Sequence, residues 1–559
     1  MSFLANAIGN PLQGAIFERA LKLPRPLTRR VHVTKNIRVP MPDGVELVAD
    51  LYEPVGIEVV GTVMSRTPYG RVGMLSRATG VPFAERGFNV LIQSVRGTHG
   101  GSGGKWEPFI NEEKDGLATL DWIENQPWYN GKLFTFGPSY VGMTQLAMLP
   151  GAGNRVAGAM PMITGSSLTD AFFPGGAFFT ALAIQWIRRM TLLERSSALA
   201  DFVEIIGDKR AQNAMRTIPL KDADMAGTGK RIVYYQEWLT ESADLAGQYW
   251  TDGREVSDRI ADIVAPVHMH AGWHDFMLPR QLDDYSKLVT AGRAPFLTVG
   301  PWTHISMESG GVAAVNAVEW FTAVAKDDPQ ALPSDRVRLY VQGADEWRTY
   351  ESFPPVGTAP QTWHLQPSGK LGVDPESIGT PRRFRWDPTD PTPDYGGAML
   401  DPNLSGRMAQ TGREARPDVL VYSSEPLVAP FEAIGPVSAT ISVRTSVPFG
   451  DVFVRLCDVD ENSISVNVCD GIQRLDPLPA PDEDGVREVF VKMWPTAYRF
   501  EPGHRLRVQV CGGSFPHFAR NTGSGEPLGE ATTFVPVDFE VLGGSSLTLS
   551  ATPIDGDWR

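Results

Sequence analysis

Hydrophobic residues recur along this chain with three different spacings. Up to about residue 164, short apolar runs such as FNVLIQS and KLFTF are separated by segments with helical spacing, as in GLATLDWIENQ, where Leu117, Leu120 and Ile123 fall on one face. Strands that alternate with helices are typical of a mostly parallel sheet covered on both faces. The same alternation returns between residues 255 and 355, which predicts one sheet built from two separate parts of the chain.

Two regions depart from this alternation. Residues 165–254 show only helical spacing, as in GAFFTALAIQWIRRMTLLER, and predict a helical cap inserted between two strands of the sheet. Residues 356–559 follow Pro-rich linkers and contain runs of period two, among them Ile464, Val466 and Val468. Many such strands without helices predict a β-sandwich of the jelly-roll type. The chain therefore divides into an α/β core over 1–164 and 255–355, the cap, and the C-terminal sandwich.

Composition and charge limit the kinds of partner that we expect. The 559-residue chain is 42% hydrophobic and carries a formal net charge of −14, so it lacks the broad positive field that favours nucleic acid or anionic membranes. No apolar run reaches the length of a membrane span. The first 26 residues also lack the basic segment that precedes the apolar core of a secretory signal. We therefore expect a cytoplasmic protein, with a homo-oligomer left open.

The sharpest local pattern is LFTFGPSYVGMTQLAM, in which an apolar strand runs through a turn into a helix. A serine at such a turn lies above the carboxyl edge of the sheet, and the next backbone N–H, that of Tyr140, points toward a developing oxyanion. Ser139 is therefore the candidate nucleophile of an α/β-hydrolase core. The match to G-x-S-x-G is imperfect, because Val141 takes the place of the second glycine, which follows as Gly142. The alternative is that Ser139 only caps the helix.

A nucleophilic serine needs an acid and a base at the ends of later strands, in the chain order Ser, Asp, His. Asp275 follows the apolar run PVHMHAGWH, and His304 follows LTVGPWT. Both positions lead to the edge of the sheet where Ser139 lies, so Asp275 can orient the imidazole while His304 takes the serine proton. His99 is the best rival base, but it precedes the serine. Tyr69, in the loop after an early strand, is either a second oxyanion donor or an aromatic that covers the strand end.

Two alternatives belong to other classes of protein. His268, His270 and His274 lie close together in the sequence, and histidines two apart on a strand share a face, as in some metallohydrolases. Their spacing does not match H-x-H-x-D-H, so we expect no metal. Jelly rolls often bind sugars, and a carbohydrate-binding protein is the other alternative. Its signature would be exposed tryptophan on the sandwich.

The segments RTPYG, RGTHGGSGG, GPSYVG, GWHD and GPWTH together resemble the cocaine esterase and X-prolyl dipeptidyl-peptidase group, the CocE/NonD hydrolases. WDPTDPTPDYGG and SFPHFARN add to the resemblance, which extends from about residue 33 to residue 545. It implies an α/β-hydrolase core, an inserted cap, a C-terminal jelly roll and the triad Ser139, Asp275 and His304. It also implies an oxyanion hole made by the Tyr69 hydroxyl and the Tyr140 N–H. We expect no cofactor.

These observations predict a serine hydrolase that cleaves a small-molecule carboxylic ester, or alternatively an amide, through an acyl-enzyme. Relatives that act on amino-acid esters hold the substrate ammonium with a carboxylate cluster. No acidic run stands beside 272–275, which disfavours the alternatives of an X-prolyl dipeptidyl-peptidase and an amino-acid ester acylase. Phe172, Phe173 and Trp186 in the cap are candidates for the acyl pocket, with a place in the cap core as the alternative. His274 is a further candidate for substrate contact.

Overall fold

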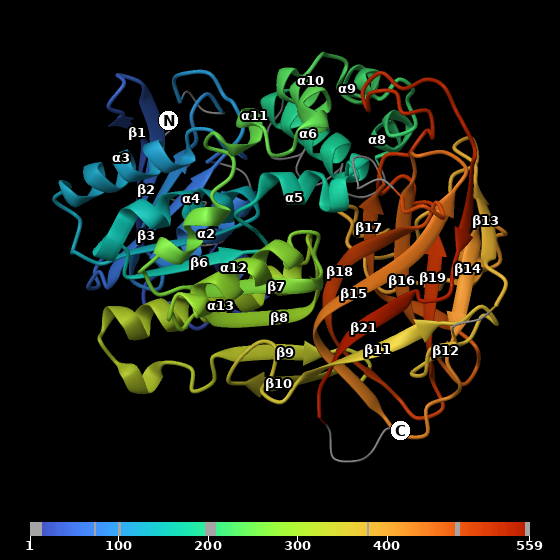
Figure 1. The fold of residues 1–559 in the computed structure, drawn as a ribbon. Helices are drawn as coiled ribbons and strands as arrows, with labels where there is room; N and C mark the ends of the chain where they lie inside the picture. The colour runs from blue at the N-terminus through green and yellow to red at the C-terminus, as the bar shows by residue number, and fades with distance from the viewer. Residues whose placement is uncertain are drawn as a thin grey trace.

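One mixed sheet of ten strands forms the framework of the core (Figure 1). The computed structural model describes residues 14–71, 74–98, 102–195, 208–376, 379–475 and 481–553. The strands lie in the order β1-β2-β4-β3-β5-β6-β7-β8-β9-β10. Their bounds are β1 (Val31–Pro40), β2 (Glu46–Pro54), β3 (Gly61–Thr67), β4 (Phe88–Ser94), β5 (Leu133–Pro138), β6 (Gly158–Met162), β7 (His268–His274), β8 (Phe296–Thr303), β9 (Val337–Val341) and β10 (Glu346–Tyr350).

Pairing in this sheet is parallel in the middle and antiparallel at both edges. The strands from β4 to β9 in the sheet order pair in parallel, whereas β1, β2 and β10 pair antiparallel. Every residue of β3, β4 and β7 is buried, as expected for strands with helices on both faces. β6 pairs with β7 across the cap insertion, so the two parts of the core form one sheet.

Helices cover both faces of the sheet and form two apolar cores. On one face, α2 and α13 pack with a helix over 14–21, and Phe83, Phe88 and Phe321 meet there. On the other face, α3, α4 and α12 pack in a core that continues into the cap and the sandwich. The bounds of these helices are α2 (Met74–Ala84), α3 (Glu112–Glu124), α4 (Tyr140–Ala152), α12 (Leu278–Thr290) and α13 (Met307–Ala325).

The cap is the helical segment between β6 and β7, and it lies above the carboxyl edge of the sheet (Figure 1). Its described part consists of helices, short turns and connecting loops. The α-helices are α5 (Leu168–Phe172), α6 (Thr180–Arg195), α8 (Lys209–Ala214), α9 (Ala223–Thr228), α10 (Val233–Thr240) and α11 (Gln248–Thr251). The 3-10 helices are η2 (Pro174–Gly176), η3 (Leu220–Asp222), η4 (Glu241–Ala243) and η5 (Ser257–Asp262).

The C-terminal part folds into two antiparallel sheets. One has the order β12-β11-β21-β15-β20-β13, with β18 beside β15, and the other has the order β14-β19-β16-β17. Along β18, the buried Val489, Val491 and Met493 alternate with exposed neighbours, which is the period-two pattern of a strand with one face in a core. The bounds are β11 (Ala359–Leu365), β12 (Leu371–Gly372), β13 (Arg382–Trp386), β14 (Val419–Ser423), β15 (Phe431–Thr445), β16 (Asp451–Val459), β17 (Ser465–Arg474), β18 (Arg487–Phe500), β19 (Arg505–Cys511), β20 (Val537–Val541) and β21 (Ser546–Ala551).

β18 attaches the sandwich to the core. The N–H of Gln342, just after β9, donates to the carbonyl of Ala497 at 2.9 Å, and the N–H of Arg499 donates to the carbonyl of Gln342 at 2.8 Å. The indole N–H of Trp494 donates to the backbone carbonyl of Asp275 at 3.1 Å. The sandwich is therefore fixed to the loop that carries the predicted catalytic acid.

Two motifs of the C-terminal part are held together by a buried ion pair. Asp394, from WDPTDPTPDYGG, accepts hydrogen bonds from Arg455 Nη2 at 2.9 Å and from Ser514 Oγ at 2.6 Å. Its second oxygen lies 3.3 Å from His517 Nδ1. Ser514 and His517 belong to SFPHFARN. Burial opposes ionisation, but Arg455 and His517 hold the pKa of Asp394 well below its usual range, so the linker stays anchored to the sandwich.

Features that would indicate other classes of protein are missing from the described residues. The tryptophans in the described part of the sandwich, Trp363, Trp386 and Trp494, are buried, so none forms an exposed platform for a sugar. None of the described helices is long and apolar enough to cross a membrane.

Candidate active site

Ser139 lies at the turn between β5 and α4. Its backbone has φ 56° and ψ −125°, a left-handed conformation that a non-glycine residue keeps only where the surrounding structure enforces it. β5 is fixed between β3 and β6, and α4 begins at Tyr140, so the turn projects the serine side chain above the sheet. As the first residue of α4, Tyr140 has an N–H without an acceptor in its own helix.

The position of the second glycine follows from the packing of α4. A Cβ at Gly142 would lie 2.6 Å from Thr164 Cγ2, too close for any side chain. Thr164 Oγ1 in turn donates to the carbonyl of Ser139 at 2.8 Å. Val141 has room because it faces Gly137, where a Cβ would lie 2.2 Å from Val141 Cγ1. The turn therefore needs its glycines at 137 and 142 rather than at 141.

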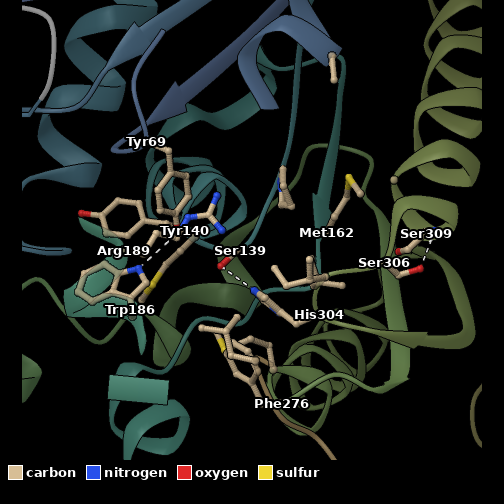
Figure 2. Close-up of a pocket in the computed structure, with 18 of the residues that line it drawn as sticks. Tyr69, Ser139, Tyr140, Met162, Trp186, Arg189, Phe276, His304, Ser306 and Ser309 are labelled. Atoms are coloured by element: carbon tan, nitrogen blue, oxygen red, sulfur yellow. Dashed lines mark hydrogen bonds between the residues drawn. The ribbon is translucent and has the colours of Figure 1, made fainter. Parts of the chain in front are cut away.

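Asp275 and His304 follow β7 and β8, which are adjacent parallel strands. Their side chains therefore reach the edge of the sheet at which Ser139 lies. Ser139 Oγ is 3.1 Å from His304 Nε2, and His304 Nδ1 is 2.7 Å from Asp275 Oδ2; Figure 2 shows the first of these contacts. The three side chains form a continuous chain of hydrogen bonds, the geometry in which an imidazole can take a serine proton.

The Asp275 carboxylate is completely buried and held from two sides. Its exposed fraction is 0%, and its Oδ1 accepts the backbone N–H of Met277 at 2.7 Å. Trp494 binds the carbonyl of the same residue, as described above. The Phe276 ring lies 4.1 Å from the His304 ring, centre to centre. These contacts leave Asp275 Oδ2 for His304 and restrict the rotation of the imidazole.

The Tyr69 hydroxyl lies in the wall of the same site. The indole N–H of Trp186 is 3.4 Å from the Tyr69 oxygen, and Figure 2 shows this contact. Because an indole N–H can only donate, the phenol oxygen accepts, and its own proton remains available to another acceptor. The N–H of Tyr69 also donates to Thr67 Oγ1 at 3.0 Å, which fixes the loop after β3.

The Tyr140 side chain belongs to the support of the site. Its hydroxyl donates to Glu112 Oε1 at 2.8 Å and accepts the Phe109 N–H at 2.9 Å. Burial raises the pKa of Tyr140 and of Glu112, although Arg66 opposes the rise for Glu112. The Tyr140 hydroxyl is thus engaged, and only the backbone N–H of this residue is available at the start of α4.

A cavity of about 270 Å³ surrounds Ser139 and His304 and extends to both sides of them. Figure 2 shows Tyr69, Trp186 and Arg189 on one side of this pair, and Met162, Ser306 and Ser309 on the other. The first side, here the cap arm, is lined by Tyr69, Phe109, Leu168, Phe172, Trp186 and Arg189. The second side, here the N-terminal arm, is lined by Phe17, Leu21, Met162, Ile163, Met307 and Ala314. Both arms are mainly apolar.

Of the predicted contact residues, the structure places Phe172 and Trp186 at the cavity but not Phe173 or His274. The Phe173 ring packs in the cap core, 5.4 Å from the Trp250 ring. His274 is buried against Gln342, and burial lowers its pKa to about 4. For His274 the physical reason is the alternation of side chains at the end of β7, because Asp275 turns toward His304 while its predecessor turns away. His99 lies outside the described residues.

His268 and His270 are buried beneath the site and contact hydroxyl groups. His268 Nε2 lies 3.0 Å from Thr298 Oγ1, and His270 Nε2 lies 3.0 Å from Ser309 Oγ. Burial lowers the pKa of each imidazole to about 3. Within the described ranges, no three His, Cys, Asp or Glu side chains are grouped closely enough to hold a metal ion. The contacts and the lowered pKa values indicate that both imidazoles are neutral and serve in packing.

Two contributors to the cavity escaped the sequence-based prediction. Arg189 follows Trp186 by three residues on α6, a spacing that places two side chains on one helix face. The helical spacing in the sequence could therefore have indicated that Arg189 lies at the cavity. The helix over 14–21 contributes Phe17 and Leu21 to the N-terminal arm. Nothing in its local sequence indicates which part of the sheet this helix covers.

Comparison with known proteins identifies the family. The profile of X-Pro dipeptidyl-peptidase (S15 family) matches residues 43–306, and that of the X-Pro dipeptidyl-peptidase C-terminal non-catalytic domain matches residues 331–547. A cocaine esterase from Rhodococcus sp. (strain MB1 Bresler) is 30% identical over 540 residues, which cover 88% of this chain and 93% of that protein. The chain belongs to the S15 family. It is a serine hydrolase that acts on esters or X-Pro peptides.

Solved structures share the fold of this S15 hydrolase. An aminopeptidase from the marine sediment archaeon Thaumarchaeota archaeon has a TM-score of 0.80 at 20% identity, covering 94% of this chain and 98% of that one. An α-amino acid ester hydrolase also has a TM-score of 0.80 at 20% identity, covering 93% and 97%. A CocE/NonD family hydrolase from Staphylococcus aureus has a TM-score of 0.69 at 15% identity, covering 93% and 94%. At these identities the likeness concerns the fold.

Trp494→Phe removes the hydrogen bond from the sandwich to the Asp275 loop but keeps a ring in place. We expect kcat to fall about 3- to 10-fold with little change in KM, because a lost hydrogen bond costs roughly 1 kcal/mol and here misplaces the carboxylate. Steady-state kinetics measures the effect. Trp386→Phe is the matched control, since its indole N–H donates to the carbonyl of Asn521 within the sandwich at 2.9 Å. Equal kcat values for the two variants would contradict the positioning role.

His268→Met should weaken the acid dependence of stability. The folded protein holds His268 with a pKa of about 3, whereas the unfolded chain takes up this proton near pH ~6.5. Below that pH the unfolded state binds more protons, so stability falls by roughly 2 kcal/mol for this side chain as the pH drops from about 7.5 to about 5. Urea unfolding at both pH values measures the difference. The difference in the free energy of unfolding between the two pH values should be smaller in His268→Met than in wild type, and unchanged in the exposed control His32→Gln. An equally large difference in His268→Met would contradict a neutral, buried His268.

Proposed function

We propose that this S15 hydrolase cleaves carboxylic esters through an acyl-enzyme formed on Ser139. The main support is the chain of hydrogen bonds from Ser139 through His304 to Asp275, with 3.1 Å and 2.7 Å between the bonded atoms. A serine hydroxyl becomes an effective nucleophile at neutral pH only when a neighbouring base takes its proton. The chain of contacts supplies that base and fixes its orientation.

The reaction then follows from the order of these contacts. Ser139 Oγ attacks the ester carbonyl carbon while His304 Nε2 takes the hydroxyl proton, and Asp275 stabilises the imidazolium that forms. The imidazolium gives this proton to the leaving alkoxide as the carbon–oxygen bond breaks. A water molecule then attacks the acyl carbon while His304 removes its proton, and the proton passes to Ser139 as the serine leaves. The net change is the addition of one water across the ester bond.

The proposed donors to the oxyanion are the Tyr140 N–H and the Tyr69 hydroxyl. The first has no acceptor in its helix. The second already accepts from the Trp186 indole, so its proton is directed away from Trp186. Donors of this kind are most effective where apolar walls exclude water, as in this cavity.

The position of His304 supports one assignment of the two halves of an ester to the two arms. The leaving oxygen must lie near His304 Nε2 to receive its proton. Ile305 and Met307, which follow the histidine, continue along the cavity wall. The leaving group therefore extends into the N-terminal arm, and the acyl group lies in the cap arm beside Tyr69 and Trp186.

An ester is favoured over an X-Pro peptide or an α-amino ester because the cavity offers nothing to hold a substrate ammonium. Among the described residues that line it, none is Asp or Glu, and Arg189 is a cation. A buried ammonium needs a carboxylate or several hydrogen-bond acceptors to offset its loss of hydration. The apolar walls suit an uncharged acyl chain at the reacting end.

Ser139→Ala should reduce kcat on an activated ester by a factor on the order of 10⁶, because no other group can take the acyl chain. His304→Ala should be nearly as damaging. The double variant should be little worse than either single one, since the two residues act in one step. Steady-state kinetics of the three variants measures these effects, with circular dichroism as the check on folding. Losses that add in the double variant, or turnover above a few per cent in Ser139→Ala, would count against the proposal.

Tyr69→Phe should lower kcat by about 10²- to 10³-fold, the effect of removing one oxyanion donor. KM should change much less, because the interaction strengthens mainly in the transition state. Tyr235→Phe is the matched control: this buried phenol donates to the Leu220 carbonyl within the cap at 2.8 Å, so the same atom is lost away from the cavity. If Tyr69→Phe turns over as fast as Tyr235→Phe, the hydroxyl does not contact the oxyanion.

A further inference from the structure

Arg189 is a cation in an otherwise apolar arm of the cavity. It lies on α6 one turn after Trp186, and both residues line the cap arm. Its guanidinium carbon lies 5.4 Å from the centre of the Tyr69 ring. Figure 2 shows the guanidinium beside the Tyr69 and Tyr140 side chains, on the cap side of Ser139. The positive charge is thus close to the place where we expect the acyl group to bind.

Within the described part of the chain, the Arg189 guanidinium has neither a hydrogen-bond nor an ion-pair partner. Its Nε is buried without an acceptor, and the guanidinium lies over the Tyr69 ring. The neighbouring Arg188 differs, because it pairs with Asp208 at 2.5 Å and donates to the Gly227 carbonyl at 2.9 Å. Arg189 as a whole is half-buried, but its Nε is shielded from solvent. Buried polar atoms normally have a hydrogen-bond partner, so a bound molecule is a natural source of the missing acceptor.

We infer that Arg189 binds a carboxylate on the acyl group of the substrate, which makes half-esters of short dicarboxylic acids the preferred substrates. The inference rests on the proposed ester hydrolysis at Ser139. A guanidinium presents parallel N–H donors that match the two oxygens of a carboxylate. Phe109, Phe172 and Trp186 wall this arm, and the low dielectric of such surroundings strengthens the pairing.

The position of the cation sets the length of the acyl chain. Arg189 stands over the ring of the tyrosine whose hydroxyl is the proposed oxyanion donor. The carboxylate and the scissile carbonyl therefore bind within the span of one tyrosine side chain. A few methylene groups, as in glutarate or adipate, bridge such a span. A long fatty acyl chain would place apolar carbon against the guanidinium.

The same charge disfavours cationic acyl groups. An α-ammonium in the cap arm would face Arg189 with no carboxylate among the described lining residues to offset the repulsion. Hydrolysis of a half-ester needs only water: the ester carbon–oxygen bond breaks, and an alcohol and a dicarboxylate are released. Arg189 acts only in binding.

Monoethyl glutarate and ethyl valerate test the inference, because they have the same acyl chain length and differ only in a carboxylate. We expect wild-type kcat/KM, followed by pH-stat titration, to be roughly 10- to 100-fold higher for the glutarate, the worth of a charge-assisted hydrogen bond. In Arg189→Leu this preference should vanish, because the glutarate should lose far more activity than the valerate. Arg210→Leu removes the same charge from the exposed cap surface, where its Nε donates to the Ala226 carbonyl at 3.0 Å, and should keep the preference.

Two results would overturn the inference while ester hydrolysis stands. One is a wild-type enzyme that shows no preference for the glutarate, a comparison that holds even if Arg189→Leu does not fold. The other is an equal loss on both esters in Arg189→Leu, which is the behaviour of a group that stabilises the oxyanion. Failure of the proposed function looks different, because wild type would then hydrolyse neither ester, and both proposals would fall together.

Discussion

The buried hydrogen bond between His304 and Asp275 lies in the loop at which the core and the C-terminal sandwich meet. A fully buried carboxylate is costly unless its oxygens are paired, and here one oxygen binds His304 and the other binds the Met277 N–H. The loop that carries Asp275 is fixed in turn by Trp494 of the sandwich. The core and the C-terminal sandwich thus meet at this residue, so the sandwich helps to position the Asp275 loop.

The cap supplies one wall of the cavity beside Ser139. Its helix α6 supplies Trp186, which holds the Tyr69 hydroxyl, and Arg189, which stands over the ring of the same tyrosine. One helix face therefore connects the proposed oxyanion donor with the charge that we expect to select the substrate. Relatives with this fold differ in what they act on, and one face of an inserted helix that lines the cavity offers a simple route to such differences.

The sequence predicted the parts of the site that follow from chain order. Ser139, Asp275 and His304 each come directly after a buried strand, and the carboxyl ends of parallel strands meet at one edge of the sheet. Contacts that depend on long-range packing were harder to predict. Phe173 and Phe172 are adjacent in the sequence, yet only Phe172 reaches the cavity. The shifted glycine of the serine turn became understandable only from the contact with Thr164.

Mass spectrometry can identify the residue that carries the acyl group during ester hydrolysis. The enzyme would be mixed with an activated ester, quenched in acid before the second half-reaction is complete, and digested for peptide mapping. The proposed acyl-enzyme mechanism predicts a mass increase of one acyl group on the peptide that contains Ser139, and no such increase in Ser139→Ala. An acyl group on a different residue, or rapid turnover with Ser139 never modified, would contradict it.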